Sequence, residues 1–163
     1  MSYSDVEEAI AGVLRASGVA GIDWGKAPYY VEAADPLPGA ADSVYSDAPF
    51  PYVAYMLPES STEHTFEDAY VETYKPTFYV VGTQKFRQTV LSPYAAGSVI
   101  AFLDSLRGTQ ANPTGPRTFN GTNFECLQFT RDGYQLGLDP SLGPKGQRVW
   151  VAQATYTMRF NLG

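Results

Sequence analysis

The C-terminal segment alternates between two kinds of side chain, and this pattern restricts the fold more than any other feature. From Val149 to Leu162 every second residue, starting at Trp150, is apolar, and most of the residues between are Gln, Thr, Arg or Asn. Successive side chains of a strand point to opposite faces, so a period of two predicts a strand with one buried and one solvated face. Such a strand needs antiparallel neighbours and an apolar layer on its buried face.

Two segments have apolar residues at helical spacing and could supply that layer. The first begins at a Ser4–Glu7 capping box and ends before Gly18. Its apolar stripe consists of Val6, Ile10, Val13 and Leu14. The second begins at Ser92-Pro93 and contains Gly97 in its middle. Its stripe consists of Tyr94, Ala95, Val99, Phe102, Leu103 and Leu106.

The remaining chain divides into further strands and loops. Strands are predicted at residues 29–32, 50–58, 69–82 and 124–129. Pro76 interrupts the third of these, which places that strand at a sheet edge or gives it a bulge. Asn120-Gly121 predicts a hairpin turn. Loops are predicted at residues 33–49, 59–68, 109–116 and 132–146, and residues 83–91 fit no class clearly.

The order helix, strands, helix, strands predicts one α+β domain over residues 1–163. We expect an antiparallel sheet with both helices packed on one face, long surface loops and a hairpin. No segment is apolar over the 18 to 20 residues that a membrane span needs. Because the first residues of the chain are acidic, we expect no cleavable secretion signal. The single cysteine, Cys126, is typical of a protein in a reducing compartment.

Charge is distributed unevenly along the chain. Residues 27–74 contain nine acidic residues and no Lys or Arg, whereas residues 75–163 contain nine basic and four acidic residues. Such asymmetry suggests an interaction surface, although solvation of long loops would explain it too. An acidic chain with a net charge of −6 is a poor nucleic-acid binder, because binding requires clustered cations. If the two halves form opposite faces, copies could associate head-to-tail.

The residues needed for catalysis are scarce. One His and one Cys cannot form a zinc site, and no phosphate-binding glycine motif or nucleophile elbow is present. We expect His64 to be a solvated loop residue and Cys126 a small buried apolar residue. The sequence therefore predicts a protein that is not an enzyme and needs no metal or other cofactor.

Four segments together resemble a known family. An N-terminal helix, DVEEAIAGVLRASGV, is followed by FPYVAYMLP, then by TYKPTFYVVGTQ leading to SPYAAGSVIAFLDSL, and finally by RVWVAQATYTMRFNLG. This order is similar to that of the tail terminator (tail completion) proteins of long-tailed bacteriophages. The resemblance covers nearly the whole chain as an order of elements.

The resemblance implies a structural virion protein of the tail and neck, assembled in the host cytoplasm. Such proteins form a ring, typically a hexamer, that caps the tail tube, ends its polymerisation and offers the surface that joins the head. The implied partners are further copies of the chain, the tail tube protein and a head-closure or connector protein. Genomic DNA would pass through the ring without specific binding, and no membrane is involved.

The charge asymmetry suggests which residues would lie at subunit contacts or on the channel wall. The acidic candidates are Glu59, Glu63, Glu67, Asp68 and Glu72. The basic candidates are Arg131, Lys145 and Arg148. An acidic wall would repel the phosphates of passing DNA.

Two other functions also fit the sequence. A head-closure or connector ring, or a tail-tube subunit, would have similar contacts, but a tube subunit polymerises by stacking. A small-ligand or carbohydrate-binding module is suggested by the 12 tyrosines.

Overall fold

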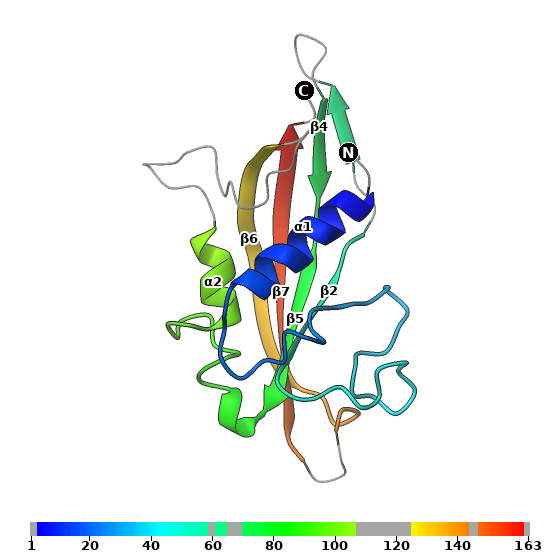
Figure 1. Ribbon diagram of the computed structural model, residues 1–163, viewed down its shortest axis with the longest axis vertical. Coiled ribbons are helices and arrows are strands. Elements are labelled where there is room, and N and C mark those ends of the chain that lie inside the picture. Colours follow the sequence, from blue (N-terminus) through cyan, green and yellow to red (C-terminus); the bar gives the residue numbers. More distant parts are fainter. Residues whose placement is uncertain (1–2, 59–60, 65–69, 107–124, 144–146, 162–163) are drawn as a thin grey trace.

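Strand β7 (Val149–Asn161) is the central strand of the sheet in the computed structural model (Figure 1). Its alternate residues from Ala152 to Phe160 are buried, and the residues between them are half-exposed. The alternation predicted from the sequence is therefore confirmed. The structure describes residues 3–58, 61–64, 70–106, 125–143 and 147–161.

Both edges of β7 are paired over most of its length. β6 (Glu125–Leu138) lies along one edge, and β4 (Tyr70–Tyr74) and β5 (Thr77–Thr83) lie along the other. β2 (Tyr52–Met56) pairs with β5, β3 (Ser61–His64) pairs with β4, and β1 (Tyr29–Tyr30) pairs with β2. Among the strand pairs that the structure describes, only β1–β2 is parallel, which the long connection between these two strands permits.

β4 and β5 form one line beside β7 in a single register. The pairing of Tyr74 with Met158 continues, without a shift, as that of Thr77 with Thr155. Between them the N–H of Tyr156 donates to the carbonyl of Pro76 at 3.0 Å. Pro76 therefore produces no bulge. On the side away from β7, β2 pairs with β5 and β3 pairs with β4, and neither strand reaches Pro76. Among the described strands, Pro76 therefore lies at a sheet edge, which is one of the two positions predicted from the sequence.

Both helices pack on one face of the sheet, and the predicted α+β fold is confirmed. α1 (Tyr3–Ala16) crosses this face, and α2 (Val99–Ser105) lies beside β6 (Figure 1). The predicted stripe of α1 is buried, and Gly18 follows with a φ of 67°. In the described part of the chain, neither helix is long and apolar enough to span a membrane.

A row of aromatic side chains runs under the helices from one strand to the next. The ring of Phe78 contacts those of Tyr55 and Tyr156, with centroids 6.5 Å and 5.4 Å away. Tyr156 also stacks on Phe129 at 4.6 Å. The row joins β2, β5, β7 and β6, so the core depends on the register of all four strands.

The second helix differs from its prediction. It begins at Val99 rather than at Ser92-Pro93, and its N-cap is Ser98, whose hydroxyl accepts a hydrogen bond from the N–H of Ala101. Gly97 lies before the helix with a φ of 80°, which ends the preceding turn. Ser92 caps only a turn, because its hydroxyl accepts from the N–H of Tyr94. Both serines have capping chemistry, and only Ser98 precedes residues that reach the core.

Two predicted loops contain strands. β3 lies within the predicted loop at residues 59–68 because it pairs with β4, and β6 extends to Leu138 because it pairs with β7. In both cases pairing overrides the low strand propensity of the acidic and glycine residues. The loop at residues 33–49 is confirmed, apart from an isolated bridge at Ala40. The predicted Asn120-Gly121 hairpin and the loop at residues 109–116 lie outside the described residues.

We expect replacement of Tyr156 by Ala to lower the free energy of unfolding by about 3–5 kcal/mol, because it empties a fully buried site between two aromatic rings. Urea denaturation followed by fluorescence measures this change. The matched control is Tyr94→Ala, since Tyr94 is 91% exposed and its loss should change stability by less than about 0.5 kcal/mol. Equal stability of the two variants would contradict the core position of Tyr156.

Candidate functional site

The structure brings few of the predicted interface residues together. Four lie outside the described residues: Glu59, Glu67, Asp68 and Lys145. Glu63 is in β3, where only the backbone is described. The others are Glu72, Arg131 and Arg148, which the structure places apart.

Glu72 and Arg148 lie at opposite ends of the sheet. Glu72 pairs with Phe160 near the end of β7, and Arg148 is the exposed residue just before its start. At about 3.3 Å per residue, the stretch from Arg148 to Phe160 separates them by roughly 40 Å along the sheet. The carboxylate of Glu72 accepts a hydrogen bond from the Tyr74 hydroxyl at 2.6 Å, so it has a partner within its own strand. These two candidates therefore do not belong to one site.

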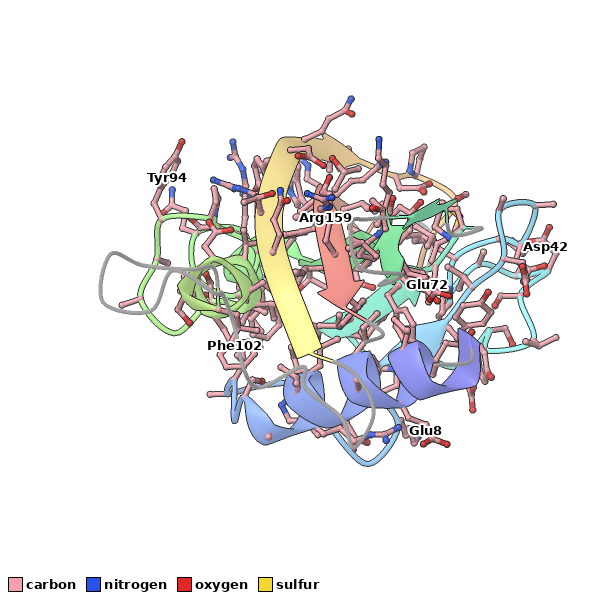
Figure 2. All side chains as sticks on the ribbon, turned by 90° about the horizontal axis from the view of Figure 1, so that it is seen from above. Glu8, Asp42, Glu72, Tyr94, Phe102 and Arg159 are labelled. Carbon is pink, nitrogen blue, oxygen red and sulfur yellow. The ribbon has the colours of Figure 1, made fainter. Side chains whose placement is uncertain are left out.

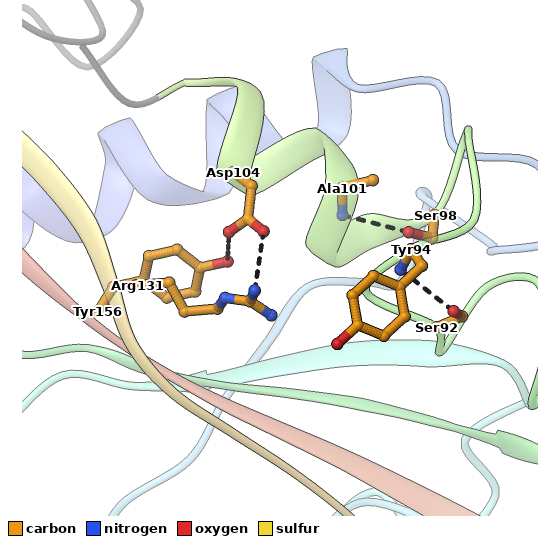
Figure 3. A network of polar contacts seen from close by, with 7 residues as sticks. All are labelled: Ser92, Tyr94, Ser98, Ala101, Asp104, Arg131 and Tyr156. Carbon is orange, nitrogen blue, oxygen red and sulfur yellow. Dashed lines mark hydrogen bonds and ion pairs between the residues drawn. The ribbon is translucent and has the colours of Figure 1, made fainter. Parts of the chain in front are cut away.

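Arg131 takes part in a contact between α2 and the sheet (Figure 3). Its Nη2 lies 3.4 Å from Asp104 Oδ2, and the Tyr156 hydroxyl donates to Asp104 Oδ1 at 2.8 Å. Burial raises the pKa of Tyr156 well above its usual range, and the hydrogen bond to Asp104 raises it further. Nη1 of Arg131 is the buried polar side-chain atom that has no partner among the described residues. The interactions of Arg131 with its own chain fix α2 against β6 and β7.

Residues 31–47, here called the acidic loop, concentrate negative charge on the surface. Their four carboxylates are all exposed: Glu32, Asp35, Asp42 and Asp47. At the tip of the loop, Val44 is 90% exposed and Tyr45 is 42% exposed. Val44 and Tyr45 therefore give the tip of the loop a small apolar surface between acids.

The acidic loop is held in one conformation by contacts with the rest of the chain. The N–H of Gly39 donates to the carbonyl of Tyr45 at 2.9 Å, and the Tyr52 hydroxyl donates to the carbonyl of Pro38 at 2.6 Å. The ring of Tyr45 lies 4.9 Å from that of Tyr29. The tip is therefore ordered before any partner binds.

The pKa values of two neighbouring groups report the negative field of this region. Burial raises the pKa of Tyr29, and Asp23 and Asp47 raise it further. Burial also raises the pKa of Glu7, with a second contribution from Glu32. In both cases nearby carboxylates disfavour another negative charge.

Residues 84–94, here called the basic segment, present cations held above aromatic rings. Lys85 Nζ lies 4.9 Å from the ring centroid of Phe86, and the Arg87 guanidinium lies 4.4 Å from that of Trp150. Trp150 is oriented in turn by a hydrogen bond from its Nε1 to Gln84. Both cations are exposed, and cation–π contacts of this kind define their positions.

Beside the basic segment lies an open groove of 730 Å³ between the end of α1 and α2. Its lining carries no charged side chain and includes Val19, Phe86, Val90, Ala101 and Phe102. Phe86 belongs to both the groove and the basic segment, and Lys85 Nζ, 4.9 Å from its ring, stands at the rim. The guanidinium of Arg87 lies over Trp150, which does not line the groove. An apolar surface with a cationic rim suits a partner with an apolar residue between acids.

The acidic loop and the groove lie on opposite flanks of the molecule. Figure 2 shows Asp42 on one side and Tyr94 and Phe102 on the other. Figure 1 shows the same separation, with the acidic loop to the right and the basic segment to the lower left. One chain therefore carries two complementary surfaces that cannot meet within the same copy.

Sequence reasoning missed the residues that form these surfaces. Asp42 and Asp47 are in the segment without Lys or Arg, so its charge imbalance was a usable signal. Lys85 and Arg87 flank Phe86 in a stretch that fits no secondary-structure class from the sequence. Within the described residues, no group of three or more His, Cys, Asp and Glu side chains could hold a metal ion. The side chains of His64 and Cys126 lie outside that description.

Comparison with protein-family models and with curated proteins found no match.

We expect Gly39→Ala to destabilise the fold by at least about 1 kcal/mol, because φ at Gly39 is 95° and a Cβ would lie 2.9 Å from the Phe50 ring. Thermal unfolding measures the loss. The control is Gly137→Ala, where a Cβ meets nothing within 4 Å. If both variants unfold at the wild-type temperature, the conformation assigned to the acidic loop is wrong.

Proposed function

We propose that this protein is a structural subunit of a bacteriophage neck that assembles into a ring, typically of six copies, on the end of the tail tube. The ring ends tube polymerisation and offers the surface that joins the head. The observation that carries this proposal is the position of the exposed carboxylates of the acidic loop on one flank and of the basic segment, with the exposed cations Lys85 and Arg87, on the other. The order of elements that resembles tail terminator proteins supports it.

Opposite charges on opposite flanks favour head-to-tail association. A contact that joins two different patches is heterologous, and it closes into a ring when the rotation between neighbours divides a full turn. A two-fold dimer centred on either flank alone would instead set like charges together. The charge distribution of this chain therefore favours a ring or a filament over a two-fold dimer joined through a single flank.

The sheet face without helices suits the wall of a channel for DNA. Its central strand presents half-exposed, uncharged side chains, among them Gln153, Thr155 and Thr157. Figure 2 shows Arg159 on this side, opposite Glu8 of α1. Affinity for DNA comes mainly from clustered cations that neutralise phosphates. A mostly neutral wall would let the duplex pass without retaining it. Glu59, Glu67 and Asp68, which the sequence assigned to subunit contacts or the channel wall, lie outside the described residues.

A tail-tube subunit is the alternative that the same observation favours, because tube proteins also form rings. The two functions differ after the ring has closed, because a tube subunit then stacks on further rings and a terminator does not. A head-closure ring differs from a terminator in the side of the neck to which it attaches.

Immunogold electron microscopy of phage particles tests the proposal, with an antibody raised against the purified chain. We expect gold at a single position, the junction between head and tail. Labelling along the whole tail would identify a tube subunit instead. Absence of label from intact and from partly disassembled particles would contradict a virion role.

A further inference from the structure

The tip of the acidic loop has an apolar side chain that no other described residue covers. Val44 is 90% exposed, whereas Tyr45 beside it leans on Tyr29. The loop is already ordered, so docking of this tip onto a partner costs little additional conformational entropy. Carboxylates Asp42 and Asp47 stand within three residues of Val44 on either side.

The groove on the other flank has the matching properties. It is lined by apolar and small residues, and Lys85 stands at its rim over Phe86, while Arg87, two residues further along the chain, lies over Trp150. Its side walls come from two parts of the chain, the turn after α1 and the segment that leads into α2. The apolar part of the tip thus corresponds to the apolar lining, and the acids beside the tip correspond to the cations at the rim.

The tip of the same copy cannot occupy its own groove. The tip and the groove lie on opposite flanks, with Asp42 at one side of the molecule and Phe102 at the other (Figure 2). A contact between them must therefore join two copies, and the resulting pair keeps one free tip and one free groove for further neighbours.

We propose that Val44 of one copy inserts into the groove between α1 and α2 of the next copy, with Asp42 and Asp47 against the neighbour's Lys85 and Arg87. This inference rests on the proposed ring and names the surfaces that close it. Steering by opposite charges sets the register of the contact, and burial of the apolar tip holds it.

Charge reversal tests the polarity of the contact. In the acid-flank variant, Asp42→Lys and Asp47→Lys place cations against cations. In the base-flank variant, Lys85→Glu and Arg87→Glu place acids against acids. Native mass spectrometry of the wild-type chain is expected to show a closed oligomer, and each variant alone is expected to be monomeric.

Mixing the two variants gives the decisive result. The basic tip of one variant fits the acidic groove of the other, and the acidic tip of the second fits the basic groove of the first. We expect the equimolar mixture to regain oligomers that contain the two variants in equal numbers. The four substitutions combined in one chain should likewise restore a homo-oligomer.

The apolar part of the contact has its own pair of variants. Val44→Ser should shift the monomer–oligomer midpoint to at least tenfold higher concentration, measured by sedimentation velocity. The matched control is Leu138→Ser, since Leu138 is 52% exposed but lies outside the tip and the groove, and its midpoint should not change. Circular dichroism should show the wild-type spectrum for every variant, because all the substituted side chains are exposed.

The outcomes separate this inference from the proposed function. A wild-type chain that stays monomeric at millimolar concentration overturns the inference, and so do single-flank variants that assemble like the wild type or a mixture that stays monomeric. If immunogold labelling nevertheless places the protein at the neck of the particle, the proposed neck function holds, and the subunits associate through contacts other than the tip and the groove. Oligomers that behave as expected, in a protein absent from phage particles, would support the contact and overturn the phage function.

Discussion

Hydrogen bonding on both edges of β7 is the constraint on which the rest of the structure depends. β6 occupies one edge, and the continuous line of β4 and β5 occupies the other, so β7 sets the register of its neighbours on either side. A shift of one residue would exchange the two faces of β7 and move Tyr156 out of the aromatic row. The same aromatic row also contacts both helices. The Tyr156 hydroxyl donates a hydrogen bond to Asp104 of α2, and the Tyr55 hydroxyl donates one to the carbonyl of Glu7 in α1. The sheet register therefore determines where both helices lie.

The candidate interface consists of loops that this scaffold positions. The acidic loop lies between β1 and β2 at one flank, and the basic segment follows β5 at the other. Loops carry binding residues in many folds because they leave the core unchanged when they vary. Here the loops are also ordered, one by backbone hydrogen bonds and the other by cations above Phe86 and Trp150. Such order makes specific docking between copies possible without a large loss of entropy.

The fold could be predicted from the sequence wherever local pattern and tertiary role agree. The alternation of β7 and the stripe of α1 both report directly which side chains are buried, and both predictions are confirmed. The start of α2 could not be predicted, because Ser92 and Ser98 carry the same capping signal. The second half of β6 contains Gly133 and Gly137, which are typical of loops, and only its pairing with β7 makes it a strand. The charge imbalance in the sequence identifies the acidic half of the chain. It does not predict which acidic residues lie on the same flank, because that depends on how the chain folds.

The acidic loop has one attachment that links it to the centre of the molecule. Ala40 forms a bridge with Leu142, and the N–H of Gly143 donates to the carbonyl of Gly39, so the loop is joined to the connection between β6 and β7. A pull on the loop therefore reaches the start of the central strand through two backbone contacts. In the proposed ring, a load on the loop would therefore pass to the hydrogen-bonded β6–β7 pair.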